Sequence, residues 1–82
     1  MKLEIVTPDQ KLFEGEAECV TLPGITGQFQ VLDRHAPLIS TLEEGLLKVR
    51  TGTTETRFTV SGGVVEVLQN HVVVLAERAQ QQ

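Results

Sequence analysis

The sequence predicts an all-β fold, a flattened antiparallel β-sandwich of roughly eight to ten short strands. Turn-forming residues recur at short intervals along the chain, which is typical of a sandwich or barrel. The stretches between them alternate apolar and polar residues, the period of a half-buried strand. Eleven Val, three Ile and nine Thr among 82 residues add side chains that favour pleated backbone.

The first half of the chain carries three alternating stretches. Leu3 and Ile5 alternate with charged neighbours before a turn at Pro8. Glutamates then alternate over residues 14–18, which predicts a solvated strand face. Residues 28–31 read Gln-Phe-Gln-Val, so the two glutamines are expected to point outward and the apolar pair inward.

The second half carries three short turns that predict hairpins, at Glu43-Glu44-Gly45, Thr51-Gly52-Thr53 and Gln69-Asn70. The unbroken apolar run at residues 72–75 is expected to be covered on both faces. Residues 75–80 could form one helical turn. The domain is expected to span residues 1–79, with a flexible tail at 80–82.

The alternation also predicts the core. Cys19 is expected to be a packed thiol, since a lone cysteine cannot form an intramolecular disulfide. The residues expected to supply most of the core are Leu3, Ile5, Phe13, Val20, Phe29, Val31, Leu47, Val49, Phe58, Val65, Val67 and Val73.

Length and charge narrow the functional classes. Eighty-two residues allow one domain with one core. A net charge of −4, scattered basic residues and the absence of Trp and Tyr argue against nucleic acid as a partner. No apolar run approaches the ~20 residues of a membrane span, and the first residues lack the features of a secretory signal. A reducing cytoplasmic setting is expected.

Chemistry at a catalytic or metal centre is not indicated. His35, His71 and Cys19 match no compact zinc spacing. His35 as a general base would need an oriented nucleophile, and strand geometry offers no relay to Ser40 or Asp33. No phosphate-cradling glycine loop precedes a helix, so no catalytic residue, metal or cofactor is expected. A small enzyme built on His35 remains the weakest alternative.

The segment from Gln28 to Pro37 is the candidate binding surface. Pro37 holds Ala36 extended and cannot donate to a strand ladder, so this connector is expected to be rigid. Neutral amides can bind across an interface without the desolvation cost of ions. The predicted partner-binding residues are Thr7, Gln28, Gln30, Asp33, Arg34, His35, Ala36 and Pro37. His71, after a turn, is expected to be solvated.

Several pieces of sequence, in order, resemble one family. They are Gly27, His35-Ala36-Pro37-Leu38, Glu44-Gly45, Ser61-Gly62-Gly63 and Val72–Ala76, together with an opening that looks like the family's first hairpin. This pattern resembles the N-terminal domain of the epsilon subunit of F-type ATP synthases, from about Leu3 to Ala79. Two positions depart from it: Gln30 stands where a second glycine is common, and Asp33-Arg34 where Pro-Gly or Pro-Asn is common.

The resemblance implies a non-catalytic central-stalk subunit that joins the rotating gamma subunit to the ring of c subunits. It implies a peripheral place on the cytoplasmic face of the bacterial inner membrane, with membrane association only through the complex. It also implies that the Gln28 end faces the c ring and the His35 end faces gamma. Family members usually continue into a C-terminal helical pair, and the resemblance stops before that region. The alternative is a free-standing β-sandwich protein-binding adaptor unrelated to ATP synthase.

Overall fold

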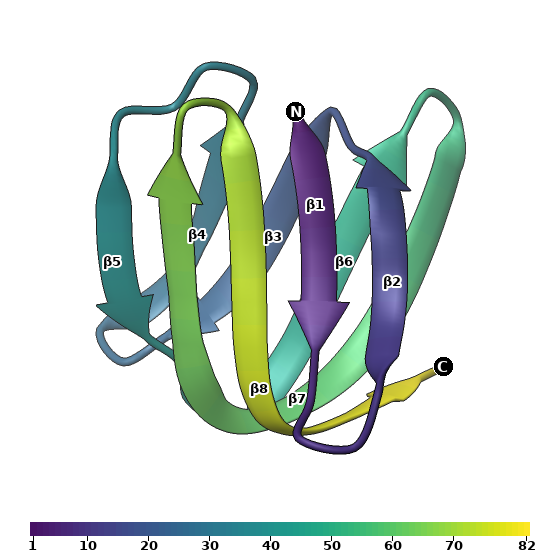
Figure 1. Ribbon diagram of the computed structural model, residues 1–82, viewed down its shortest axis with the longest axis vertical. Helices are drawn as coiled ribbons and strands as arrows, with labels where there is room; N and C mark the ends of the chain where they lie inside the picture. Colours follow the sequence, from purple (N-terminus) through teal and green to yellow (C-terminus); the bar gives the residue numbers. More distant parts are fainter.

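The computed structural model describes residues 1–82 and contains eight strands and no helix (Figure 1). The strands are β1 (Lys2–Val6), β2 (Lys11–Glu16), β3 (Cys19–Gly24), β4 (Gly27–Leu32), β5 (Leu38–Thr41), β6 (Gly45–Thr51), β7 (Thr54–Leu68) and β8 (His71–Gln81). The predicted all-β class is therefore confirmed. No helix is long and apolar enough to cross a membrane.

The strands form one hydrogen-bonded sheet that folds over into a two-layered sandwich. The pairing order is β2-β1-β8-β7-β6-β3-β4, with β5 added on β7. The long strands β7 and β8 curve from one layer into the other (Figure 1). We call the layer made by β2, β1, β5 and the adjoining halves of β7 and β8 the β1 layer. The β3 layer contains β4, β3, β6 and the other halves of the two long strands.

Two details of the predicted sandwich differ in the structure. The strands are not all short, since β7 has 15 residues and β8 has 11. They are also not all antiparallel, because β1 runs parallel to β8 from Lys2↔His71 to Val6↔Leu75. Parallel neighbours need a long crossover rather than a tight turn. Here that crossover is almost the whole chain, which local sequence cannot reveal.

Gly62 and Gly63 make the bend that lets β7 serve both layers. Their φ angles are 71° and 119°, in the region that favours glycine. A Cβ added at Gly63 would lie 2.1 Å from the Leu75 carbonyl oxygen on β8. The two glycines therefore provide both the backbone conformation and the close approach of the two long strands.

Two of the predicted hairpin turns are confirmed and one is wrong. Gln69 and Asn70 have φ of 50° and 60°, and Gly52 has φ of 62°, so both turns use the left-handed region. The hairpin predicted at residues 43–45 does not form, since β5 and β6 each pair with β7 instead. The chain passes there between the layers, and the Glu43 amide donates to the Pro23 carbonyl at 2.8 Å.

The core lies between the two layers and contains 17 buried apolar residues. Every residue predicted for the core is buried or packs against it, except Val73. Val72 and Val74 are buried instead, and Leu75 is 49% exposed. The prediction that this run is covered on both faces is therefore wrong, because the outer face of the sheet has no covering layer. Cys19 is a buried free thiol, as expected.

The helical turn predicted for residues 75–80 is also wrong. Strand β8 continues to Gln81, and Gln80 and Gln81 pair with Thr59 and Phe58. The first half of β7 has an edge free for β8, so strand pairing overrides the weak local helical pattern. The Gln82 amide donates to the Arg57 carbonyl at 2.9 Å. The flexibility of residues 80–82 stays a prediction.

Candidate partner-binding surface

The loop between β4 and β5 is fastened at its start by two hydrogen bonds. The N-terminal ammonium of Met1 donates to Asp33 Oδ1 at 2.7 Å. The Arg34 amide donates to Asn70 Oδ1, also at 2.7 Å. The pKa of the Asp33 carboxyl is lowered, first by the hydrogen bond from the ammonium and then by Asn70. The loop is thus held to the start of β1 and to the β7–β8 turn.

Arg34 occupies a backbone conformation that arginine seldom adopts. Its φ of 63° lies in the left-handed region, which favours glycine and asparagine. Those are the residues that the family pattern commonly carries at this position. The hydrogen bond to Asn70 compensates part of the cost of placing arginine there.

His35, Ala36 and Pro37 then form an extended and accessible connector. The His35 amide donates to the Leu32 carbonyl at 3.1 Å, which closes a turn. The His35 ring nitrogen Nδ1 lies 2.7 Å from the Ala36 carbonyl oxygen, so this nitrogen donates. His35 is half-buried, while Ala36 and Pro37 are exposed. The loop therefore presents a shape that is set before a partner arrives.

Gln28 and Gln30 lie on β4, the edge strand of the β3 layer. Both are exposed, while Phe29 packs against the core and Val31 is buried, as the alternation predicts. The Gln30 side-chain amide donates to Thr21 Oγ1 at 3.4 Å. The glutamines adjoin the loop along β4 and leave their remaining polar atoms free.

Thr7 lies at the other end of the molecule. It closes the β1–β2 turn, where its amide donates to the Gln10 carbonyl at 2.9 Å and its hydroxyl donates at 3.2 Å. Figure 1 shows this turn and the β4–β5 loop at opposite ends of the sandwich. The structure therefore gathers residues 33–37 in one loop, places Gln28 beside the β3–β4 turn at the other end of β4, and leaves Thr7 apart from the loop.

An apolar surface beside the loop was missed by sequence reasoning. On the outer side of the β1 layer, Ile39 is 73% exposed, and Leu68, Leu75 and Val64 are also exposed. Val64 and Leu75 are directly paired across β7 and β8. We call these four residues the apolar face. A shallow groove joins it to the loop, lined by Pro37, Leu38, Ile39, Glu66, Val67 and Leu68. Glu66, directly paired with Ile39, places one carboxylate within this face. In the sequence, the only sign of the apolar face was the unbroken apolar run at residues 72–75.

The first hairpin carries a network of charges at the edge of the apolar face. Lys11 Nζ lies 2.9 Å from Glu4 and 3.2 Å from Glu14. His71 Nε2 lies 2.5 Å from Glu4 Oε2, so His71 is engaged rather than simply solvated. The pKa of Glu4 is lowered, first by its hydrogen bond with Lys11 and then by His71. The pKa of Glu14 is lowered by the same lysine.

These shifts predict a loss of stability in acid. A carboxyl whose pKa is lower in the folded state stabilises the fold above its ordinary value of 4.5 and loses that contribution as pH falls. We expect the midpoint of thermal unfolding to fall between about pH 6 and pH 3. Glu4→Gln should be less stable at neutral pH and show a shallower decrease. An unchanged slope in the variant would show that the network does not contribute.

The fold and the loop together define a small β-sandwich domain with an ordered, accessible loop. The family described as "ATP synthase, Delta/Epsilon chain, beta-sandwich domain" matches residues 1–82. The chain belongs to this family, which confirms the resemblance read from its sequence.

Two relatives show the range of lengths in this family. The ATP synthase epsilon chain of Dehalococcoides mccartyi is 45% identical over 80 residues, which are 98% of this chain and 57% of the relative. The epsilon chain of Caulobacter vibrioides is 39% identical over 79 residues, 96% of this chain and 92% of the relative. The chain thus spans little more than half of the first relative and most of the second.

Solved structures share the fold at low sequence identity. A chain of the Euglena gracilis mitochondrial ATP synthase superposes with a TM-score of 0.90 at 23% identity, over 96% of this chain and 51% of that one. A second match is a chain of the Tetrahymena thermophila mitochondrial ATP synthase, from a structure of the central stalk and c ring. It superposes with a TM-score of 0.84 at 17% identity, over 98% of this chain and 65% of that one. At these identities, the likeness is one of fold.

Proposed function

We propose that the chain is a non-catalytic central-stalk subunit of a rotary, proton-translocating ATP synthase. In this role, it joins the gamma subunit to the ring of c subunits and supports coupling and assembly. Membership of the epsilon family supports the proposal, as does the central-stalk and c-ring assembly in which one structural neighbour was solved. The domain itself breaks no bond and needs no cofactor in this role.

The observation that carries the proposal is the fastened β4–β5 loop. The contacts of Asp33 and Arg34 hold its start, and Pro37 restricts its end. A loop that is ordered before binding loses little conformational entropy when a partner docks. Force passed through such a contact is transmitted to the sandwich instead of being absorbed by a flexible segment.

The two ends of this surface suit different neighbours. The His35 end adjoins the apolar face, and apolar area with a polar rim is typical of a stable protein interface. We assign this end and the apolar face to gamma. The Gln28 end of β4 offers neutral amides on an edge strand, and we assign it to the c ring. The protein would then be peripheral, at the cytoplasmic face of a bacterial inner membrane.

His35→Asp tests the proposed contact with gamma. The change places an anion at a half-buried position of the loop, and an unpaired charge buried at an interface is costly. We expect gamma binding to weaken by about 2 kcal/mol, roughly thirtyfold in Kd. Calorimetry or a pull-down with purified gamma measures this, while thermal melts check that the variant is folded.

Thr53→Asp is the matched control. Thr53 is exposed in the β6–β7 turn, away from the loop, and the substitution makes the same change in charge. His71→Asp is unsuitable because it would put a second carboxylate beside Glu4. If the two variants bind gamma equally well, or if His35→Asp unfolds the domain, then the loop is structural and the assignment fails.

A further inference from the structure

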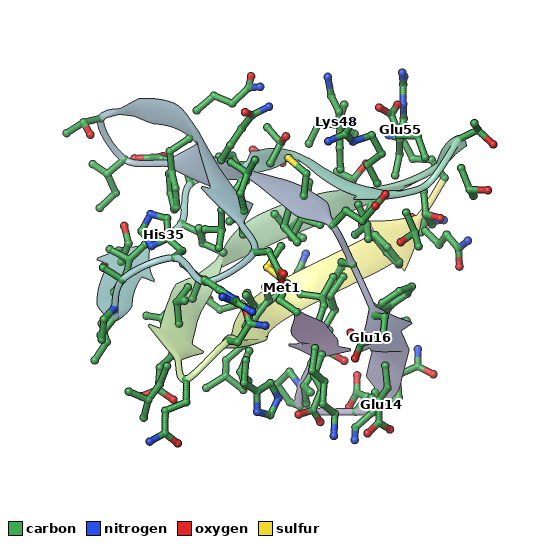
Figure 2. The ribbon with its side chains drawn as sticks, turned by 90° about the horizontal axis from the view of Figure 1, so that it is seen from above. Met1, Glu14, Glu16, His35, Lys48 and Glu55 are labelled. Carbon is green, nitrogen blue, oxygen red and sulfur yellow. The ribbon has the colours of Figure 1, made fainter.

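The outer side of the β3 layer collects most of the positive charge of an acidic protein. The chain has seven Lys and Arg residues and a net charge of −4. Lys48 and Arg50 on β6, Arg57 on β7 and Arg78 on β8 lie at outward positions of this layer. We call these four residues the cationic face. Figure 2 shows Lys48 and Glu55 together on this side of the molecule.

The fold pairs only part of this charge, since Glu55 stands opposite Arg50 across β6 and β7 and contacts Arg57. Lys48 stands directly opposite Arg57 across β6 and β7. Like charges at directly paired positions are destabilising. The Oε2 atom of Glu55 lies 2.7 Å from Arg57 Nε, and Glu77 is the neighbour of Arg78 along β8. Lys48, Arg50 and Arg78 have no carboxylate within 4.0 Å.

The lysines on the opposite side of the sandwich behave differently. Lys11 contacts Glu4 and Glu14, and Lys2 lies 3.4 Å from Glu14. Those two cations are neutralised within the first hairpin. The contrast shows that the lack of ion pairs at Lys48, Arg50 and Arg78 does not follow from a shortage of acidic residues in the chain.

The neighbouring side chains on this face are neutral hydrogen-bonding groups. Thr59 pairs with Gln80, and Thr21 pairs with Lys48 and accepts a hydrogen bond from Gln30. A sheet holds such groups at about 7 Å along a strand and about 4.8 Å between strands. Carboxylates three or four residues apart on a helix have a similar spacing of about 5–6 Å.

We propose that the cationic face docks an acidic segment of a partner protein that presents two or more carboxylates. Three of the four cations are arginines, whose planar guanidinium matches a carboxylate with two hydrogen bonds. The chain has no Trp or Tyr, so the face lacks both an aromatic anchor for lipid and a stacking platform for bases. The four cations lie apart from the β4–β5 loop and the apolar face, and Thr21 links the cationic face to Gln30 on β4. The proposal does not depend on the proposed function, because it uses none of the residues assigned to gamma or to the c ring.

A direct test uses a short oligoglutamate peptide and the 82-residue chain in low salt. We expect chemical shift changes to concentrate on β6, on the first half of β7 and on the end of β8, with binding weakened by added salt. The double variant Lys48→Gln, Arg50→Gln should weaken binding about tenfold, since each exposed ion pair contributes modestly. Its midpoint of thermal unfolding should change little, because the variant removes both the repulsive Lys48–Arg57 pair and the attractive Arg50–Glu55 pair.

The double variant Lys2→Gln, Lys11→Gln is the control because it makes the same change in net charge on the opposite side. It should bind the peptide like the parent and unfold at a lower temperature, since those lysines are paired. No binding of the peptide in low salt, or an equal loss in both double variants, would overturn the proposal. Stronger binding to phosphatidylglycerol vesicles or to single-stranded RNA than to the peptide would overturn it as well.

Discussion

Replacing Phe58 with alanine is expected to lower the free energy of unfolding by roughly 3–5 kcal/mol. Phe58 heads the fully buried side chains by volume, with 0% exposure. Its ring meets Phe13 edge to face, with centroids 6.0 Å apart and an interplanar angle of 81°. The substitution removes this contact and leaves a cavity between the two layers. The free energy of unfolding of a folded protein is typically only about 5–15 kcal/mol, so the variant should be marginally stable.

Urea unfolding followed by circular dichroism measures the loss. Phe29→Ala is the matched control, because Phe29 is only partly buried at the edge of the core. It should cost clearly less than Phe58→Ala. A loss below about 1 kcal/mol for Phe58→Ala would mean that this ring does not hold the two layers together.

Phe58 also shows what the sequence could predict. Alternation over residues 54–60 indicated which side chains point inward, and a strand with one covered face obeys that pattern. Alternation could not be applied at residues 72–75, because all four residues are apolar and no polar residue marks the outer face. Only the structure shows that Val72 and Val74 are buried while Val73 and Leu75 face outward.

The extended path of the β4–β5 loop was predictable for a similar reason. Its signals are local, since a proline and the residue before it restrict their own backbone. The fastening of Asp33 to Met1 and of Arg34 to Asn70 joins residues 32 and 36 positions apart. Such contacts depend on which strands become neighbours in the fold, and the local sequence does not show this.

The apolar face and the cationic face could not be predicted for the same reason, since both depend on strand pairing. Each gathers side chains from different strands, and each strand alone contributes one or two unremarkable residues. Val64 meets Leu75, and Lys48 meets Arg57, only because β7 pairs with β8 along its length and with β6 along its first half. Along β7 the buried positions change from Phe58 and Val60 to Val65 and Val67, so the alternation shifts by one residue at the Gly62-Gly63 bend. The sequence alone does not show whether such a shift marks a bend within one strand or the start of another.

Gly63→Ala tests that shared strand, and we expect it to lower the free energy of unfolding by roughly 3–5 kcal/mol or to prevent folding. The added Cβ would lie 2.1 Å from the Leu75 oxygen and 2.8 Å from the Ala76 Cα. Both are backbone atoms, which cannot turn aside as a side chain can. The φ of 119° adds a conformational cost for any residue with a Cβ.

Gly52→Ala separates these two costs. Gly52 also has a positive φ, 62°, but a Cβ there meets no atom within 4 Å. This control should lose only about 1–2 kcal/mol, the cost of the left-handed backbone. Urea unfolding of both variants gives the comparison, and equal losses would show that the close approach of β7 to β8 does not matter.

The first half of β7 contributes to the cationic face and the second half to the apolar face. A bend that opened would therefore move the two proposed surfaces relative to each other, in addition to destabilising the core.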